Sequence, residues 1–485
     1  MTLKQKTVSG LLWSFIESFS TQGITFIVGI ILARLLTPKE FGLIGMITIF
    51  IAISMTFIGS GFSKALIRKK DCSEIDYSTV FYFNLLVGIL FFGTLYVAAP
   101  AISRFYDEPQ ITSLVRVLGI VLVIDSLTII QRTTLTRRID FKLQTKVSLI
   151  ANIISGGIAV TMAFQGFGVW SLVAKTISQQ GMSSILLWLW NRWRPLWAFS
   201  MRSFKELFSF GSKLLLSSLI DTVYSNIYYL VIGKYFSAVE LGFYTRAEQF
   251  KNLPAQNING VMSRVTYPVL AQMQDDTVRL KAAYKKMIKT VMYVSFILMA
   301  GMAATAEPMV ISLIGEQWRP SIIYLQLLTF PGVFYPLQSL NLNMLNVLGR
   351  SDLFLKLEII KKLIAIPTII IGVIWGIKIM ILGMWVNTLI AYYLNSYYSG
   401  KFINYPMKEQ VRDILPSLFF ALGMGAIVFV AGKFIEASYL LKFILQIIIG
   451  AVITLAASEI LKPEPYVYIK EIVMDKIKTM KRGKP

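Results

Sequence analysis

Apolar stretches of about 20 residues follow one another along almost the whole chain, separated by short polar segments. A helix of this length crosses the ~30 Å hydrocarbon core of a bilayer and satisfies its own backbone hydrogen bonds there. The pattern therefore predicts an all-α integral membrane protein with about fourteen transmembrane helices. Within about three residues at each end, we expect them at 11–36, 41–62, 79–100, 113–131, 147–165, 168–190, 209–232, 241–267, 288–312, 321–347, 359–376, 379–399, 413–433 and 439–461.

The polar segments are too short to hold a soluble domain with a core of its own. One of the longer ones, RWRPLWAFSMRSFKE, is basic and aromatic and suits a connector at the membrane interface. It predicts a division of the chain into lobes of six helices each. The predicted parts are an N-terminal six-helix lobe (1–191), a basic cytoplasmic connector (192–206), a C-terminal six-helix lobe (207–400), two additional helices (401–462) and a basic cytoplasmic tail (463–485).

A sequence repeat supports this division. The segment ARLLTPKEFGLIGM at 33–46 returns as GKYFSAVELGFYTR at 233–246, a constant shift of 200 residues. Six helices per half is an even number, so both halves enter the membrane in the same orientation and form two pseudo-symmetric lobes. The paired positions are Arg34 and Lys234, Thr37 and Ser237, Glu40 and Glu240, Gly42 and Gly242, and Lys64 and Arg264.

Lysine and arginine gather in both tails and in alternate connections, which places both termini in the cytoplasm. The net charge of +22 is therefore mainly a topology signal, with membrane lipids as the nearest partner, and does not indicate nucleic-acid binding. A composition of 55% hydrophobic and 15% charged residues agrees with a membrane protein. The connections expected outside carry only Lys39, Arg104, Lys234, Arg319, Lys378 and Lys433.

Several chemistries lack their usual residues. Histidine is absent and Cys72 is the one cysteine, so no disulfide framework, cysteine-based metal site or histidine general base is available. No G-x-x-x-x-G-K-[ST] phosphate loop is present, which argues against direct ATP hydrolysis. We therefore expect no catalytic residues, no metal site and no cofactor.

Polar residues inside the spans are the candidate site, because an ionisable group at mid-bilayer costs roughly 2.5 to 3.5 kcal/mol and usually faces protein or water. In span 209–232, Lys213, Asp221 and two serines follow at four-residue spacing, with Tyr224 beside them. In span 241–267, Arg246 heads a polar face that ends at Arg264, and Pro254 is expected to open or kink the helix. Guanidinium groups suit phosphates, and amides and tyrosines suit sugar hydroxyls. The candidate substrate-binding residues are Arg246, Lys213, Lys251, Gln249, Gln256, Arg264, Lys175, Arg34 and Tyr224, and the candidate ion-coupling residues are Glu17 and Asp221.

Structural roles compete with these assignments. Arg34 and Lys234 at the outer helix ends could snorkel to water or pair with Glu40 and Glu240. Lys64 and Arg264 could act as positive-inside anchors, and Lys213 and Asp221 as a structural pair. Asp125 and Arg132 share a helix face, which favours an internal polar network.

Four segments resemble a known family: ARLLTPKEFGL, LGFYTRA, YPVLAQMQDD and the RRIDFK loop. Together with the fourteen-helix layout, they are similar to the polysaccharide transporter (Wzx-type flippase) branch of the multidrug/oligosaccharidyl-lipid/polysaccharide exporter superfamily. The resemblance implies two lobes around a central cavity lined by helices 1, 2, 7 and 8. It also implies alternating-access transfer of an undecaprenyl-diphosphate-linked oligosaccharide, such as an O-antigen, capsule or exopolysaccharide repeat unit, from the inner to the outer leaflet of a bacterial cytoplasmic membrane. Polysaccharide polymerase and chain-length machinery would be its partners.

Three other classes stay open. A cation-coupled drug or small-molecule antiporter of the same superfamily would show a dominant carboxylate site. A major-facilitator transporter usually carries G-x-x-x-D-R-x-G-R after its second helix, where this chain reads SKALIRKKDCSEIDYS. A membrane-embedded polysaccharide polymerase or glycosyltransferase would need a long outer loop or a carboxylate cluster. The pair Asp275 and Asp276 is instead typical of a helix start.

Overall fold

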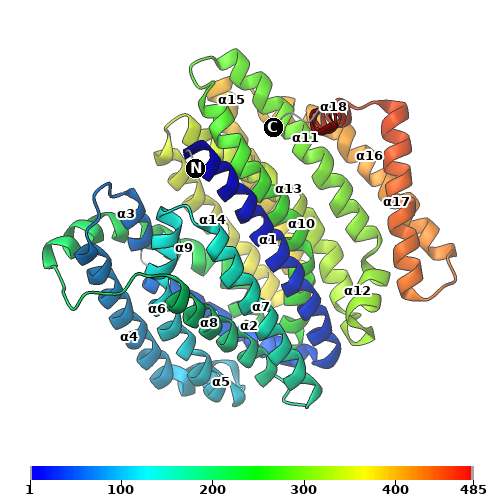
Figure 1. Cartoon of the computed structure of the whole chain (residues 1–485). Helices are drawn as coiled ribbons and strands as arrows, with labels where there is room; N and C mark the ends of the chain where they lie inside the picture. The colour runs from blue at the N-terminus through cyan, green and yellow to red at the C-terminus, as the bar shows by residue number, and fades with distance from the viewer. Residues whose placement is uncertain (1–2, 60, 482–485) are drawn as a thin grey trace. The chain divides into compact units, whose positions relative to one another are not determined.

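The computed structural model describes residues 3–59 and 61–481, and within these ranges every regular element is a helix (Figure 1). The chain forms two compact units, Met1–Gly242 and Phe243–Pro485. The first contains α1 (Leu3–Leu35), α2 (Pro38–Gly59), α3 (Phe62–Arg68), α4 (Glu74–Tyr106), α5 (Gln110–Leu118), α6 (Ile120–Arg137), α7 (Phe141–Phe164), α8 (Trp170–Trp190), α9 (Met201–Tyr235) and the start of α10 (Ala238–Ala271). The second contains the rest of α10, then α11 (Thr277–Ala304), α12 (Ala306–Ile314), a 3₁₀ turn (Glu316–Trp318), α13 (Ser321–Val347), α14 (Ser351–Trp375), α15 (Ile377–Ile403), α16 (Met407–Phe434), α17 (Tyr439–Leu461) and α18 (Glu464–Lys481).

Helix ends in the first unit follow local capping chemistry. The Ser73 side chain accepts a hydrogen bond from the Asp76 amide, and the Asp76 carboxylate accepts one from the Ser73 amide, which starts α4 with a capping box. Asp140 caps α7 and Ser200 caps α9, and in each case the side chain accepts one hydrogen bond from a backbone amide of the first turn. Within the unit, α7 packs on α1 and α8, and α9 packs on α2.

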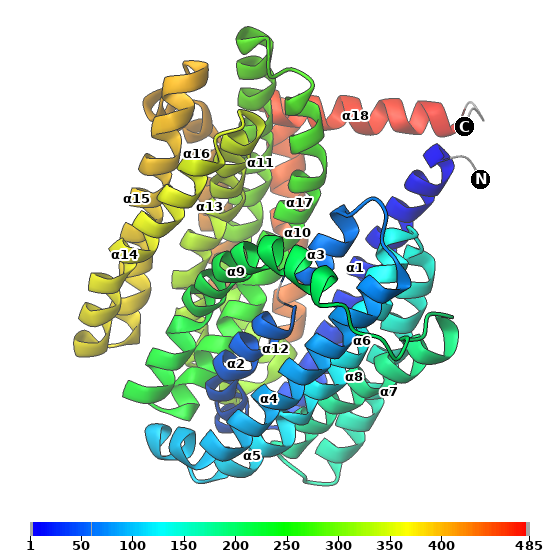
Figure 2. The ribbon, with the colours of Figure 1, turned by 90° about the vertical axis from the view of Figure 1, so that its left-hand side faces the viewer.

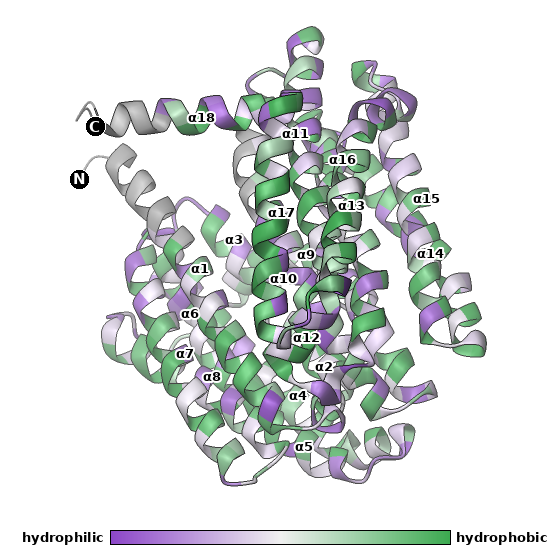
Figure 3. Cartoon of the chain, turned by 90° about the vertical axis from the view of Figure 1, so that its right-hand side faces the viewer, coloured by the Kyte–Doolittle hydropathy of each residue, from purple (hydrophilic) through white to green (hydrophobic). Residues whose placement is uncertain are grey.

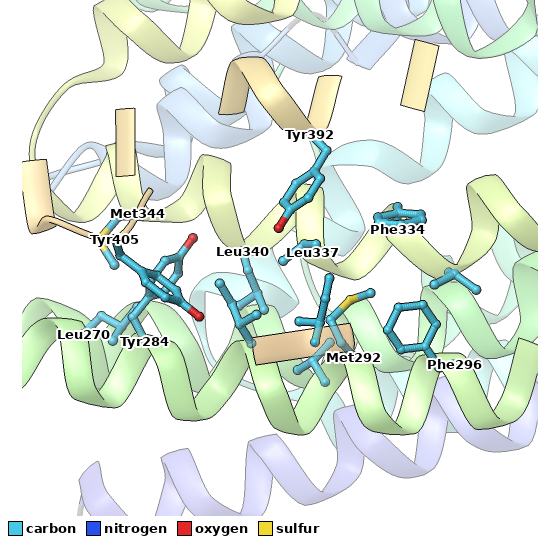
Figure 4. Packing of buried hydrophobic residues seen from close by; sticks show 14 of the residues in the cluster. Leu270, Tyr284, Met292, Phe296, Phe334, Leu337, Leu340, Met344, Tyr392 and Tyr405 are labelled. Carbon is cyan, nitrogen blue, oxygen red and sulfur yellow. The ribbon is translucent and has the colours of Figure 1, made fainter. Parts of the chain in front are cut away.

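The core of the second unit lies where α11, α13 and α15 meet (Figure 4). Tyr284, Leu337, Leu340 and Tyr392 are almost fully buried there. Tyr284 donates a hydrogen bond to Asn341 of α13, which satisfies a hydroxyl that would be costly to bury alone. Helix α18 follows the end of α17 and, near the top of the view in Figure 2, runs across the direction of α17 instead of continuing it.

Both units repeat one order of elements: a long helix, a helix of nine residues and a second long helix. In the first unit these are α4, α5 and α6, and in the second they are α11, α12 and α13. The spans predicted at 113–131 and 288–312 are therefore each interrupted, at Gly119 and at Thr305. Hydropathy alone does not show these breaks because the residues on both sides of them are apolar.

Ten helices among the described residues are long and apolar enough to cross a membrane. They confirm an all-α, multi-pass membrane fold. The four predicted spans outside this set coincide with α8, α10, α13 and α14, so the count of fourteen stays a prediction. Helix α17 is apolar along most of its length (Figure 3), as expected of a helix that faces lipid.

Candidate functional site

The polar stripe of α9 lies on a face that its own unit leaves uncovered. Lys213, Asp221 and Ser225 are exposed, whereas Tyr224 is half-buried. The neighbouring Thr222 turns toward α2, where its hydroxyl lies 2.8 Å from that of Thr56. An ionised lysine on an apolar helix is unfavourable against acyl chains, so this face requires water or polar surroundings within a membrane.

Arg246 is held in place near the start of α10. One terminal nitrogen donates to the Gln249 side-chain oxygen at 2.6 Å, and the guanidinium carbon lies 5.9 Å from the centre of the buried Trp318 ring. An arginine fixed by a hydrogen bond and a ring face loses less side-chain entropy when it binds a planar anion. The structure therefore brings together two of the predicted site residues, Arg246 and Gln249.

Lys251 lies in a different environment on the same helix. Its ammonium is 4.0 Å from the Glu248 carboxylate, and its side chain is only 15% exposed. The aliphatic stem packs on Gly332 of α13, where a Cβ atom would lie 2.8 Å from the lysine Cγ. Lys251 is thus packed inside the second unit, and an ion pair accompanies its burial.

The structure describes only part of the C-terminal half of the predicted polar face of α10. Gln256 is exposed, whereas the side chain of Arg264 lies outside the described residues. Helix α10 runs without interruption from Ala238 to Ala271, so the predicted opening at Pro254 is wrong, and the alternative of a kink there stays a prediction. Neighbouring side chains and local adjustment can compensate for the hydrogen bond that proline lacks in a membrane helix.

The remaining candidates lie on α1 and α8 of the first unit. The Glu17 carboxylate accepts a hydrogen bond from Ser148 of α7 at 2.7 Å, which fixes α1 to α7. Lys175 is half-buried in α8, and Arg34 is exposed at the end of α1. The sequence alone does not identify the Ser148 contact, because it joins residues far apart in the chain.

The repeated segment forms a close reciprocal contact. A Cβ atom at Gly42 would lie 1.6 Å from the Ala238 carbonyl oxygen, and one at Gly242 would lie 1.9 Å from the Pro38 carbonyl oxygen. Both contacts therefore require glycine, and each joins positions that the shift of 200 residues exchanges. The repeat in the sequence indicates that the two glycines correspond, but it does not predict that each packs against a backbone carbonyl of the other segment.

Two lysines of the repeated segments form ion pairs with carboxylates that lie outside these segments. Lys234 lies 3.6 Å from Asp107, and Lys39 lies 2.9 Å from Glu108, both in the turn after α4. The suggested pairing of Lys234 with Glu240 is thus replaced by one with Asp107. The Glu40 carboxylate instead accepts from the Thr37 amide and hydroxyl at the start of α2.

The expected internal network around Asp125 is confirmed. Gln180 of α8 donates to Asp125 at 3.3 Å, and its side-chain oxygen accepts from Arg132 at 3.5 Å. These bonds join α6 to α8 within the first unit.

Two residues that contact the candidate site were not predicted from the sequence: Trp318 beside Arg246, and Gly332 beneath Lys251. Neither belongs to a motif, so only the folded contact reveals them.

Comparison with known proteins identifies a family model and relatives that match this chain. The family model described as "Polysaccharide biosynthesis protein" matches residues 31–323. The teichuronic acid biosynthesis protein TuaB of Bacillus subtilis (strain 168) is 27% identical over 354 residues, which cover 73% of this chain and 73% of TuaB. The succinoglycan biosynthesis transport protein ExoT of Rhizobium meliloti (strain 1021) is 26% identical over 318 residues, which cover 65% of this chain and 64% of ExoT.

A solved structure shares the fold. The lipid II flippase MurJ in its inward closed conformation matches with a TM-score of 0.77 and 16% identity, covering 93% of this chain and 98% of MurJ. At this identity the match concerns the helical architecture, and it agrees with the fold class that the hydropathy pattern predicts.

Proposed function

Because the chain belongs to the polysaccharide biosynthesis protein family and is a membrane transporter, we propose that it translocates an undecaprenyl-diphosphate-linked oligosaccharide from the inner to the outer leaflet. The cargo would be a repeat unit of an O-antigen, a capsule or an exopolysaccharide. The match over residues 31–323 carries the proposal, because it ties this helical chain to polysaccharide synthesis.

The chemistry of the cargo fits the candidate residues. A diphosphate is anionic, and dragging it bare through hydrocarbon would be prohibitive. Lys213 and Arg246 offer cationic groups for its oxygens, and Arg246 is already oriented by Gln249 and Trp318. Tyr224, Gln249 and Gln256 offer hydrogen bonds to sugar hydroxyls. The proposed set is completed by Lys175, Lys251, Arg264 and Arg34.

The proposed mechanism is alternating access by two lobes, 1–191 and 207–400, joined by the connector 192–206. The lobes enclose a hydrated, electropositive cavity that opens to one side of the membrane at a time. The polyprenyl tail stays in lipid while the headgroup passes. Glu17 and Asp221 are the proposed sites at which a coupling cation or proton acts, and Ser148 positions the Glu17 carboxylate.

The proposed location is the bacterial cytoplasmic membrane, with both termini in the cytoplasm. The distribution of lysine and arginine supports this orientation. There the transporter would receive its cargo from the cytoplasmic leaflet and deliver it to a polysaccharide polymerase and chain-length machinery outside.

Reconstitution tests the proposal. We expect wild-type protein in liposomes to exchange a fluorescent lipid-diphosphate oligosaccharide between leaflets, and we expect Arg246→Ala and Lys213→Ala to slow this exchange about tenfold or more. Lys378→Ala, which removes an exposed lysine outside the proposed path, is the matched control. Unchanged exchange in both site variants would refute the cationic path.

The same liposomes separate the alternatives. Proton- or sodium-driven uptake of cationic dyes without leaflet exchange would favour the antiporter. Lengthening of the sugar chain by purified protein would favour a polymerase. The proposal predicts leaflet exchange with the oligosaccharide unchanged in length.

A further inference from the structure

The second unit contains a pocket that none of the candidate transport residues lines. It has a volume of about 410 Å³ and lies where α11 and α16 end and α13 and α17 begin. This volume falls within the range of small-molecule sites. In the orientation that the lysine distribution predicts, this end of the unit meets the outer leaflet. The lining is partly apolar, from Ile322, Ile323 and Phe429, and partly charged.

The charge of the pocket is positive. Lys433 and Lys442 line it from α16 and α17, and within the described part of the chain neither ammonium has a carboxylate at ion-pair distance. Arg319 and Glu307 also line it, and Arg319 pairs with Glu307 at 2.9 Å and with Glu316, so this group of three has a net charge of −1 and the two lysines leave the pocket region with a net charge of +1. Arg319 further donates to the Tyr439 hydroxyl at 3.1 Å, which links the pocket rim to α17. Lys433 and Lys442 are therefore available to bind an anion, and the contacts of Arg319 hold the edge of the pocket in place.

The side chain of Gln446 provides a buried hydrogen-bond acceptor in the lining of the pocket. Gln446 of α17 is 2% exposed and lines the pocket, and its amide nitrogen donates to the Val428 carbonyl at 2.9 Å. Its side-chain oxygen is buried without a hydrogen-bond donor. Such a group is costly unless a ligand or water donates to it. Gly432 makes room for this amide, because a Cβ there would lie 1.9 Å from the Gln446 nitrogen.

The ligand must therefore supply an anion, a hydroxyl donor and apolar chains. Next to the pocket, α17 exposes Leu440, Leu441 and Ile444, a surface suited to acyl chains. A zwitterionic headgroup would bring its own ammonium toward two lysines, which is unfavourable. We propose that this pocket binds an anionic phospholipid with a hydroxylated headgroup, of the phosphatidylglycerol type. Lys433 and Lys442 pair with the phosphodiester, and a headgroup hydroxyl donates to Gln446.

Lipid-dependent thermal stability of the full chain in detergent tests this site. Phosphatidylglycerol should raise the unfolding temperature of wild-type protein by several degrees more than phosphatidylcholine does, because a ligand that binds only the folded state stabilises it. The Lys433→Gln/Lys442→Gln variant should lose this difference. Lys378→Gln, an exposed lysine at the same end of the unit, should keep it. Equal shifts in the double variant and in wild type would overturn the proposal.

Two further arms identify the ligand. Inorganic phosphate and glycerol phosphate should give little shift, and a full shift with either would show a site for free phosphate instead of a lipid. Phosphatidylmethanol has the anion but no headgroup hydroxyl, so wild-type protein should prefer phosphatidylglycerol over it. Gln446→Met should abolish that preference while keeping the preference over phosphatidylcholine. An unchanged preference in Gln446→Met would refute the role of the acceptor.

Discussion

Gly42 and Gly242 show what a single residue contributes to this molecule. Each lies against a backbone carbonyl of the opposite repeat, so a methyl group at either position has no space. We expect Gly42→Ala and Gly242→Ala each to lower the free energy of unfolding by about 1–3 kcal/mol through overpacking. Thermal unfolding in detergent measures this. Gly93→Ala, where no atom lies within 4 Å, should be neutral or slightly stabilising, and an equal loss there would contradict the packing argument.

Cys72 permits a test of local burial. Its thiol is half-buried and lies 3.2 Å from the Leu66 carbonyl oxygen, and burial raises the pKa of the thiol although Arg137 beside it acts in the opposite direction. The folded state therefore favours the protonated thiol, and this contribution to stability is present at neutral pH and lost as the pH rises through the raised pKa.

We expect maleimide to react with Cys72 in the folded protein more slowly than with the same thiol in denaturant, with a rate that still climbs above pH 9. Mass spectrometry at several pH values measures the rate. A plateau below pH 8 would show an activated thiol and contradict the burial argument.

At the scale of elements, a charged cluster fixes α16 to α11. Asp413 lies 3.0 Å from Lys285 and 3.6 Å from Lys289, and it accepts a hydrogen bond from Tyr405 at 2.7 Å. We expect Asp413→Ala to lower the free energy of unfolding by about 2 kcal/mol, because the Tyr405 hydroxyl would lose its acceptor and Lys285 and Lys289 would each lose one of two carboxylate partners. Glu464→Ala removes an exposed partner of Lys289 and should cost at most about 1 kcal/mol. Thermal unfolding of both variants checks the contrast, and similar losses would contradict it.

The positions of the helices were predictable from the sequence, and their contacts were not. The predicted stretches all coincide with helical segments, two of them with a pair of consecutive helices, because a backbone in lipid must satisfy its own hydrogen bonds over the thickness of the bilayer. The breaks at Gly119 and Thr305 carry no such signal. The pairing of Arg246 with Trp318 joins residues more than 70 positions apart, which helical spacing cannot report. Polar positions in the spans therefore identified candidates, and the fold identified their neighbours.

At the scale of the whole molecule, the distribution of lysines predicts an orientation. In a protein with Cys72 replaced by alanine, Lys378→Cys should react with a membrane-impermeant maleimide in intact cells, whereas Arg279→Cys should react only after permeabilisation. Both native side chains are exposed, so accessibility is matched. The reverse pattern would invert the proposed topology and place the N-terminus outside.

The central claim is that cationic groups of the spans carry an anionic headgroup across the membrane. Its most direct test compares, in liposomes containing wild-type protein, the leaflet exchange of two polyprenyl lipids that bear the same oligosaccharide, one through a diphosphate and one through a neutral linker. We expect the diphosphate lipid to exchange at least about tenfold faster, the ratio that about 1.4 kcal/mol of charge recognition produces. Equal rates for the two lipids would contradict the account.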